Sequence, residues 1–253
     1  MGTSHRQHGH GARSGRRGLS GALRGLVLAG PVVAASLAAT WSPPAGAAAA
    51  PAPSALLREV AAEVNLVPAD LPGWDHNAGH VGAAGPALLK ELQCAGAVPP
   101  ARSGVMAVPS PAFGSVSNYE QVGSLVEMVS TTAYARQDLH AQQGPRMPAC
   151  AQQALEAELH AHLPGNYRLS SVKVDRMALP WLPAAISFAY RESVTIRAKQ
   201  SATFTEDAIS FVLGRAEVNL YVEALEGTPG AHLEQRLGLL LLHRAEAHRA
   251  QLS

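Results

Sequence analysis

Residues able to perform chemistry are frequent in this chain, but their spacing predicts no catalytic or metal centre. His76 and His80 lie in a glycine-rich segment in which no helix would align them. The five-residue spacing of His243 and His248 does not bring two ligands to one side of a helix. The sequence also contains no G-x-S-x-G nucleophile elbow, no H-E-x-x-H zinc motif and no phosphate-binding loop. We therefore expect a protein that is not an enzyme and that needs no metal or other cofactor.

Cys94 and Cys150 are the only cysteines of the chain. A redox-active or metal-binding pair is one alternative, but redox pairs usually have the short C-x-x-C spacing. No histidine lies near either cysteine at the spacing of a metal ligand. In an oxidising compartment an isolated pair most often forms a disulfide. We predict this bond, and closing a loop of roughly 57 residues would stabilise the fold by about 4 kcal/mol.

One acidic residue lies where the pattern of its strand expects an apolar one. Glu192 falls on the apolar face of a predicted strand, between Tyr190 and Val194. A β-bulge could turn the side chain outward, or Arg197 or Arg215 could pair with it. The functional alternative is a buried carboxylate that lines a ligand pocket together with Tyr190.

Two small residues suggest a place for such a pocket. Gly214 and Ala216 lie on the apolar face that we expect for residues 212–222. Either a helix packs closely over them, or they leave room for a hydrophobic ligand. The candidate ligand-binding residues are therefore Tyr190, Glu192, Gly214 and Ala216, and the expected ligand is a small hydrophobic or envelope-derived molecule.

The N-terminal segment has the three parts of a secretory signal peptide. Residues 1–24 contain five arginines and no acid, residues 25–39 are apolar and uncharged, and residues 41–53 are almost entirely small residues and proline. The apolar part is shorter than the roughly 20 residues that span a bilayer. We expect a leader and linker over residues 1–53, a single domain over residues 54–253, and a secreted or cell-envelope location. An uncleaved N-terminal anchor is the alternative, and it would be the protein's contact with the membrane.

Arg16 and Arg17, with Leu19 at the apolar position after the pair, partly match a twin-arginine export signal. Basic pairs also occur in ordinary signal peptides, so the general and the twin-arginine routes both stay open. A bacterial lipid anchor would need a cysteine just after the apolar part, whereas the first cysteine is Cys94.

The charge of the chain argues against nucleic acid as a partner. The whole chain has 20 basic and 19 acidic residues, and five of the basic ones lie in the leader. The remaining 15 basic and 19 acidic residues leave the domain with a net charge of −4. Such a domain lacks the basic surface that neutralises phosphates.

Hydrophobic periodicity predicts an α+β domain. The expected helices are residues 55–64, 86–93, 133–143, 151–163 and 232–251, and the expected strands are residues 116–131 (one strand or a pair), 169–179, 185–199 and 210–225. Residues 210–225 alternate most regularly, and residues 75–114 are expected to be irregular apart from one short helix. We predict an antiparallel sheet of four or five strands with helices packed mainly on one face.

Several local motifs occur in a recognisable order. They are Leu71-Pro72-Gly73-Trp74, Ser110-Pro111-Ala112-Phe113, Pro148-Ala149-Cys150 and Phe211-Val212-Leu213-Gly214-Arg215. Over residues 66–249 the chain resembles the exported sensor-like domains of actinobacteria, which form the outer part of some receptor serine/threonine kinases and also occur as free secreted or lipid-anchored proteins. The resemblance implies an α+β fold with a groove for an envelope ligand and no catalysis.

The chain departs from that family in lacking a kinase half and a lipid-anchor cysteine, and in having one cysteine pair where the kinase-linked type has two. Our expectation is an exported, non-catalytic ligand-binding or sensor-like protein of the cell envelope. The alternatives are a secreted protein-interaction module or an unrecognised hydrolase.

Overall fold

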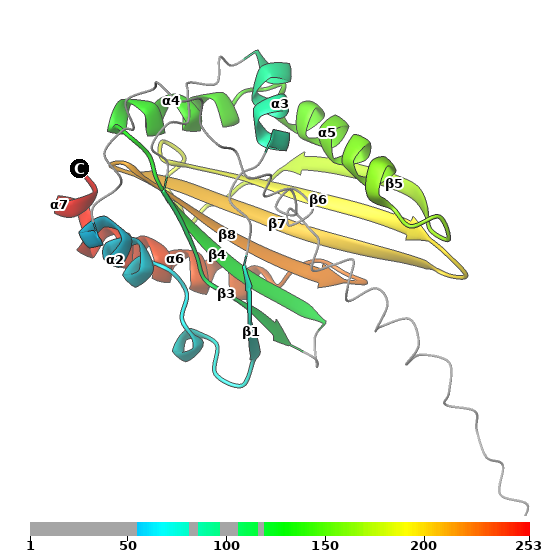
Figure 1. The fold of residues 1–253 in the computed structure, drawn as a ribbon, viewed down its shortest axis with the longest axis horizontal. Coiled ribbons are helices and arrows are strands. Elements are labelled where there is room, and N and C mark those ends of the chain that lie inside the picture. The colour runs from blue at the N-terminus through cyan, green and yellow to red at the C-terminus, as the bar shows by residue number, and fades with distance from the viewer. Residues whose placement is uncertain (1–54, 81–85, 97–105, 116–118) are drawn as a thin grey trace, which may run out of the picture. The chain divides into compact units, whose positions relative to one another are not determined.

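The computed structural model describes residues 55–80, 86–96, 106–115 and 119–253, all within one compact unit, Pro31–Ser253 (Figure 1). The expected leader, including Arg16 and Arg17, lies outside these residues, so its processing stays a prediction. Among the helices in the described ranges, none is both long enough and apolar enough to cross a membrane.

Within the described residues, eight antiparallel strands form a single sheet (Figure 1). In spatial order they are β1 (Asp75–His80), β3 (Pro111–Ser115), β4 (Glu120–Met128), β8 (Ala216–Leu225), β7 (Ser201–Leu213), β6 (Ser187–Arg197) and β5 (Arg168–Arg176), while β2 (Met106–Pro109) pairs with β4 beside β3. The predicted α+β class is confirmed, but the expectation of four or five strands is wrong. Strands β1, β2 and β3 come from the segment that we expected to be irregular, because short strands with Gly and Pro carry no clear alternation and are defined by pairing with their neighbours.

The most regular stretch of the sequence, residues 210–225, forms two strands instead of one. Leu213 pairs with Ala216, and the two residues between them make the turn of the β7–β8 hairpin. Gly214 has φ +61°, as expected for the first central residue of a type II′ turn. The turn reverses the direction of the chain, so Val212 and Val218 lie on opposite faces of the sheet rather than on the shared face that we predicted.

Helices cover both faces of the sheet (Figure 1), so the expectation of helices mainly on one face is wrong. Helices α2 (Ala55–Val64), α6 (Ala231–Ala247) and α7 (Arg249–Leu252) pack on one face, here called the α6 face. Helices α3 (Pro86–Ala95), α4 (Thr132–Gln142) and α5 (Met147–His162) pack on the other, the α5 face. Strand β4 shows why two layers are needed, because Leu125 and Val126 are both fully buried although they point to opposite sides.

The two faces are packed differently. On the α6 face one continuous hydrophobic core joins the sheet to α2, α6 and α7, and it includes Val64, Val126, Phe211, Leu220, Leu237 and Leu241. On the α5 face two smaller apolar clusters are present, one around Leu92, Met147, Val174 and Tyr190 and the other around Val129, Tyr134, Leu139 and Val212. The middle of the α5 face is therefore left to the polar residues of β6, β7 and β8.

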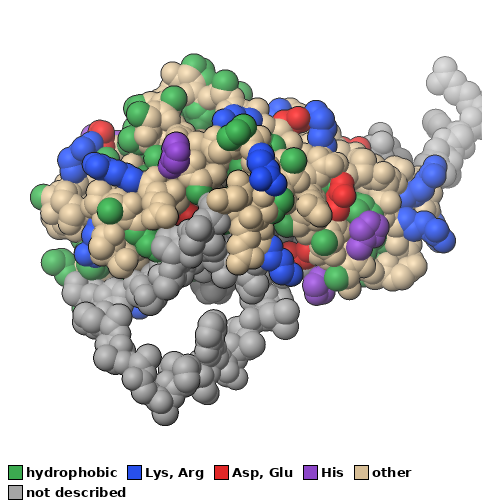
Figure 2. Space-filling model, turned by 90° about the horizontal axis from the view of Figure 1, so that it is seen from above, with side chains coloured by type: hydrophobic (Ala, Val, Ile, Leu, Met, Phe, Trp, Pro, Cys, Tyr) green, Lys and Arg blue, Asp and Glu red, His purple; other side chains and the backbone are tan. Residues whose placement is uncertain are grey.

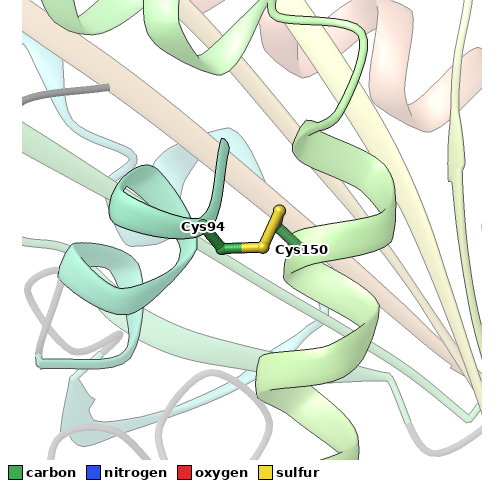
Figure 3. Close-up of a disulfide and its surroundings, with 2 residues drawn as sticks. All are labelled: Cys94 and Cys150. Atoms are coloured by element: carbon green, nitrogen blue, oxygen red, sulfur yellow. A yellow bond between two sulfur atoms is a disulfide. The ribbon is translucent and has the colours of Figure 1, made fainter. Parts of the chain in front are cut away.

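The predicted disulfide is present. Cys94 of α3 and Cys150 of α5 have an S–S distance of 2.04 Å and a Cα–Cα distance of 5.7 Å (Figure 3). Helix α5 begins at Met147, earlier than the expected residue 151, because proline is accepted in the first turn of a helix. Cys150 therefore projects from a helix, and the bond fixes the short α3 against α5.

Candidate functional site

Three glutamates form a row across the centre of the sheet. Glu192 of β6 lies directly opposite Glu206 of β7, which lies directly opposite Glu223 of β8. Glu192 follows Tyr190 by two residues and therefore shares its face, the α5 face. Like charges directly opposite each other destabilise a sheet. This acidic row (Glu192, Glu206 and Glu223) is therefore not explained by the needs of folding.

Helix α3 adds a fourth carboxyl group to the row. Glu91 precedes the buried Leu92, whose side chain packs in the cluster that contains Tyr190. Burial, followed by the negative charge of Glu158 on α5, raises the pKa of Glu91 to about 7. The charge of Glu91 in turn acts on Glu192. The disulfide thus fixes against α5 the helix whose Glu91 makes Glu192 harder to ionise.

Burial makes the row hard to ionise. The side chain of Glu206 is 8% exposed, and burial, followed by the charges of Glu223 and Glu192, raises its pKa well above the ordinary value. Burial also raises the pKa of Glu192 and that of Glu223 to about 7. A hydrogen bond between the carboxyl groups of Glu206 and Glu223 adds to the rise in the pKa of Glu206 and opposes the rise in the pKa of Glu223.

On the side of the row toward the β7–β8 turn, the residues of β7 and β8 that come next on the α5 face are small or polar. Ala208 and Tyr221 form the next directly opposed pair, and Ser210 and Asn219 form the pair after it. The hydroxyl of Ser210 donates a hydrogen bond of 2.5 Å to Oδ1 of Asn219. Seen from the side of α3, α4 and α5, the visible acidic side chains are scattered among Lys and Arg (Figure 2).

The structure places Glu192 in this row without a bulge, because the register of β6 with β7 is continuous through it. Arg197 lies an odd number of residues away and so points to the other face, and Arg215 lies in the β7–β8 turn. Neither of the structural roles that we considered for Glu192, an outward bulge or a pair with one of these arginines, is therefore present.

Tyr190 anchors a helix end near the row. Its hydroxyl group donates a hydrogen bond to the carbonyl oxygen of Gln142, the last residue of α4. The guanidinium carbon of Arg176 lies 5.8 Å from the centre of the Tyr190 ring, and Arg176 also donates to the carbonyl oxygens of Gln143 and Gly144. Tyr190 therefore borders the row but is itself occupied in packing.

Gly214 and Ala216 do not join Tyr190 and Glu192. Ala216 is fully buried in the core of the α6 face. Gly214 lies in the hairpin turn, where a Cβ atom would come within 2.0 Å of the carbonyl oxygen of Leu252. The structure thus brings together two of the four predicted site residues, and the space around the other two is filled by the chain itself.

Sequence reasoning missed Glu206, Glu223 and Glu91. The alternation of β8 separates Glu223 from the core residues, but it reads equally well as a solvent-facing side. Only the pairing of β7 with both neighbouring strands shows that Glu206 connects Glu192 to Glu223.

Another buried carboxyl group lies on the α6 face, and there a cation is present. Arg191 donates to both oxygens of the fully buried Asp207, at 2.7 and 2.5 Å. Glu234, in the first turn of α6, is 3% exposed. Burial, followed by a hydrogen bond with Asp207, raises the pKa of Glu234 to about 8. These three residues connect α6 to the sheet, so they have a structural role that the acidic row lacks.

Within the described ranges, no group of three or more His, Cys, Asp or Glu side chains is arranged to hold a metal ion. Comparison of the chain with protein-family models and with curated proteins finds no match.

Proposed function

We propose that this protein is an exported, non-catalytic ligand-binding or sensor-like protein of the cell envelope, and that its ligand binds at the acidic row on the α5 face. The observation that carries the proposal is the row itself, in which three adjacent strands present carboxyl groups in register and α3 adds a fourth. Among the described residues, none of the lysines or arginines forms an ion pair with these four groups. Buried acids without a cation destabilise a fold, and such groups are typical of functional sites.

The layout of the α5 face supports binding there. On the α6 face a single apolar core fills the space between sheet and helices, whereas the apolar clusters of the α5 face lie on either side of small and polar residues. The resemblance to exported sensor-like domains points in the same direction, because it implies a groove for an envelope ligand. A leader cleaved on export would place this face outside the cytoplasm.

The proposal is tested by native mass spectrometry of the protein recovered from the culture medium of a producing cell. We expect a small molecule to remain bound to the wild type and to be lost from the triple variant Glu192→Gln/Glu206→Gln/Glu223→Gln. Glu59→Gln, which changes an exposed acid of α2, serves as the matched control and should keep the ligand. A wild type that carries no molecule, or a triple variant that carries the same one, would contradict the proposed site.

One observation favours a second candidate, a hydrolase. Two neighbouring, hydrogen-bonded carboxyl groups, such as Glu206 and Glu223, are an arrangement that enzymes use for general acid–base catalysis. A panel of glycoside and peptide substrates distinguishes the two functions. Turnover by the wild type that is lost in Glu206→Gln would establish an enzyme, whereas binding without turnover supports the first proposal.

A further inference from the structure

Helix α3 is attached to the domain mainly through α5, to which the disulfide joins it (Figure 3). Its buried Leu92 packs in the smaller apolar cluster that also contains Met147, Val174 and Tyr190. Among the ion pairs of the described residues, none involves α3. The attachment of this short helix therefore depends on one covalent bond and one small apolar cluster.

Like charges oppose the docking of α3. Burial, followed by the negative charge of Glu158 on α5, raises the pKa of Glu91 to about 7. Besides burial, the charge of Glu91 contributes to the raised pKa values of Glu192 and Tyr190 on β6. When Glu91 is ionised, its charge therefore works against the contact of α3 with α5 and with the sheet.

Two cations lie near α3, and both are exposed. Lys90 belongs to the helix itself, and Arg146 lies beside Gly96, where a Cβ atom would be 3.9 Å from Nη1 of the arginine. A cation at the C-terminal end of a helix is favourable, but exposed charges contribute little. The other charged side chains and histidines of α4 and α5 do not act on Glu91; they are Arg136, Asp138, His140, Glu156, His160 and His162.

We propose that the Cys94–Cys150 bond is a reducible clasp, opened by a dithiol reductant, and that the reduced α3 leaves α5 and the sheet when Glu91 is ionised. The rest of the domain stays folded, because the continuous hydrophobic core lies on the other face of the sheet, under α2, α6 and α7. Opening the clasp exposes the apolar side chains against which Leu92 packs. It also removes from Glu192 the charge of Glu91, whether or not a ligand binds there, so the clasp goes beyond the proposed function.

The reductant reaches the bond from the side of α3. Cys94 is half-buried, whereas Cys150 is 4% exposed. A thiolate of the dithiol attacks the sulfur of Cys94, forms a mixed disulfide with it and releases Cys150 as a thiolate, which takes up a proton. The second thiol of the dithiol then displaces Cys94. The dithiol gives up two electrons and two protons and ends as a disulfide, and both cysteines end as thiols.

The pH determines whether the reduced helix stays in place. In the docked helix the pKa of Glu91 is about 7, against an ordinary value of 4.5, so docking favours the protonated form. Docking of the reduced helix is therefore strongest below pH 4.5 and weakens as the pH rises to about 7. Each pKa unit changes the docking equilibrium about tenfold, so the full shift corresponds to as much as about 300-fold.

The test is hydrogen exchange of the whole mature protein before and after reduction, measured by mass spectrometry of peptides. Dithiothreitol, a dithiol, reduces the protein at pH 8, and part of the sample is then brought to pH 5.5 without oxygen. Oxidised and reduced protein are compared at the same pH, because exchange itself depends on pH. At pH 8 we expect α3 to exchange about tenfold faster or more after reduction, while β7, β8 and α6 keep their protection. At pH 5.5 the ratio for α3 should be about tenfold smaller.

Variants separate the role of the charge from that of the bond. Glu91→Gln keeps the shape of the side chain without its charge, so its reduced α3 should exchange about tenfold more slowly at pH 8 than that of the reduced wild type. Glu59→Gln, which changes an exposed acid of α2, is the matched control and should behave as the wild type does. Cys94→Ala leaves the clasp open without reductant and should reproduce the reduced wild type. If this variant does not fold, as circular dichroism reports, the reduced wild type decides.

The proposal is overturned if dithiothreitol reduces the bond only after the domain has been denatured, or if reduction leaves the exchange of α3 unchanged at pH 8. It is equally overturned if β7, β8 and α6 lose protection together with α3, since the bond then supports the whole domain. Equal exchange of α3 in reduced Glu91→Gln and in the reduced wild type at pH 8 would overturn the role of the Glu91 charge.

Discussion

Replacing Glu192 by glutamine should stabilise the protein at pH 8, contrary to the usual effect of changing a buried polar residue. Glutamine has almost the same shape as glutamic acid but cannot ionise. The acidic row opposes ionisation, because burial, followed by the charges of Glu91 and Glu223, raises the pKa of Glu192 from 4.5 to about 7. The substitution therefore removes an unfavourable charge.

The sign and size of the effect follow from the linkage between protonation and folding. Between pH 4.5 and about 7 the folded protein holds a proton on Glu192 that the unfolded chain has lost, so the free energy of unfolding falls as the pH rises through this range. At 1.36 kcal/mol for each pKa unit, the full shift corresponds to about 3 kcal/mol above pH 7. The glutamine amide still has to find hydrogen-bond partners in the row, so we expect a net gain of about 1–3 kcal/mol at pH 8. Below pH 4.5 both side chains are neutral, and the gain should vanish.

Thermal denaturation followed by circular dichroism measures this difference. For a domain of this size the midpoint at pH 8 should rise by roughly 3–10 °C in Glu192→Gln, and the gain should shrink steadily toward pH 4.5. Glu59→Gln, at an exposed position, should shift the midpoint little at any pH. A gain that is the same at pH 5 and pH 8, or a loss at pH 8, would refute the reasoning from burial and like charge.

Three further predictions concern the disulfide, the hairpin and the leader. Cys94→Ala should lower the free energy of unfolding in denaturant by about 2–5 kcal/mol, because the bond closes a long loop, and reductant should have the same effect on the wild type. Gly214→Ala should lower the free energy of unfolding by about 1–3 kcal/mol, because the φ angle of Gly214 is positive and the new Cβ atom would meet the carbonyl group of Leu252. Gly165→Ala is the control and should have little effect, because a Cβ atom at this position would have no neighbouring atom within 4 Å. Mass spectrometry of protein from the medium should find an N-terminus between residues 47 and 54, and an intact Met1 would contradict export with cleavage.

Local patterns in the sequence were enough to predict several elements. Helix α2 has the predicted bounds, Ala55–Val64, because its apolar residues repeat at the spacing of a helix and are buried on one side. Helices α4 and α5 and strands β4, β5 and β6 lie near their expected positions for the same reason. The disulfide was predictable because the chain has two cysteines and a leader typical of export.

The missed strands lack such a pattern. Strand β7 contains Thr205, Glu206 and Asp207 in succession, which reads as a loop because all three are polar. All three are buried in the structure, where Asp207 meets Arg191 on one face and Glu206 lies in the acidic row on the other. Their burial depends on partners on other strands, which local periodicity does not contain.

The sequence by itself therefore determined the class of the fold, most of its helices and the cysteine bond, because composition and short-range periodicity carry this information. The number of strands, the helices on both faces and the acidic row were decided only by tertiary structure. Glu192, Glu206 and Glu223 belong to three different strands, and their alignment depends on the register of two strand pairings. Register is set by the packing of the whole sheet and by its turns, so a single glutamate in the sequence does not reveal which acids will lie beside it.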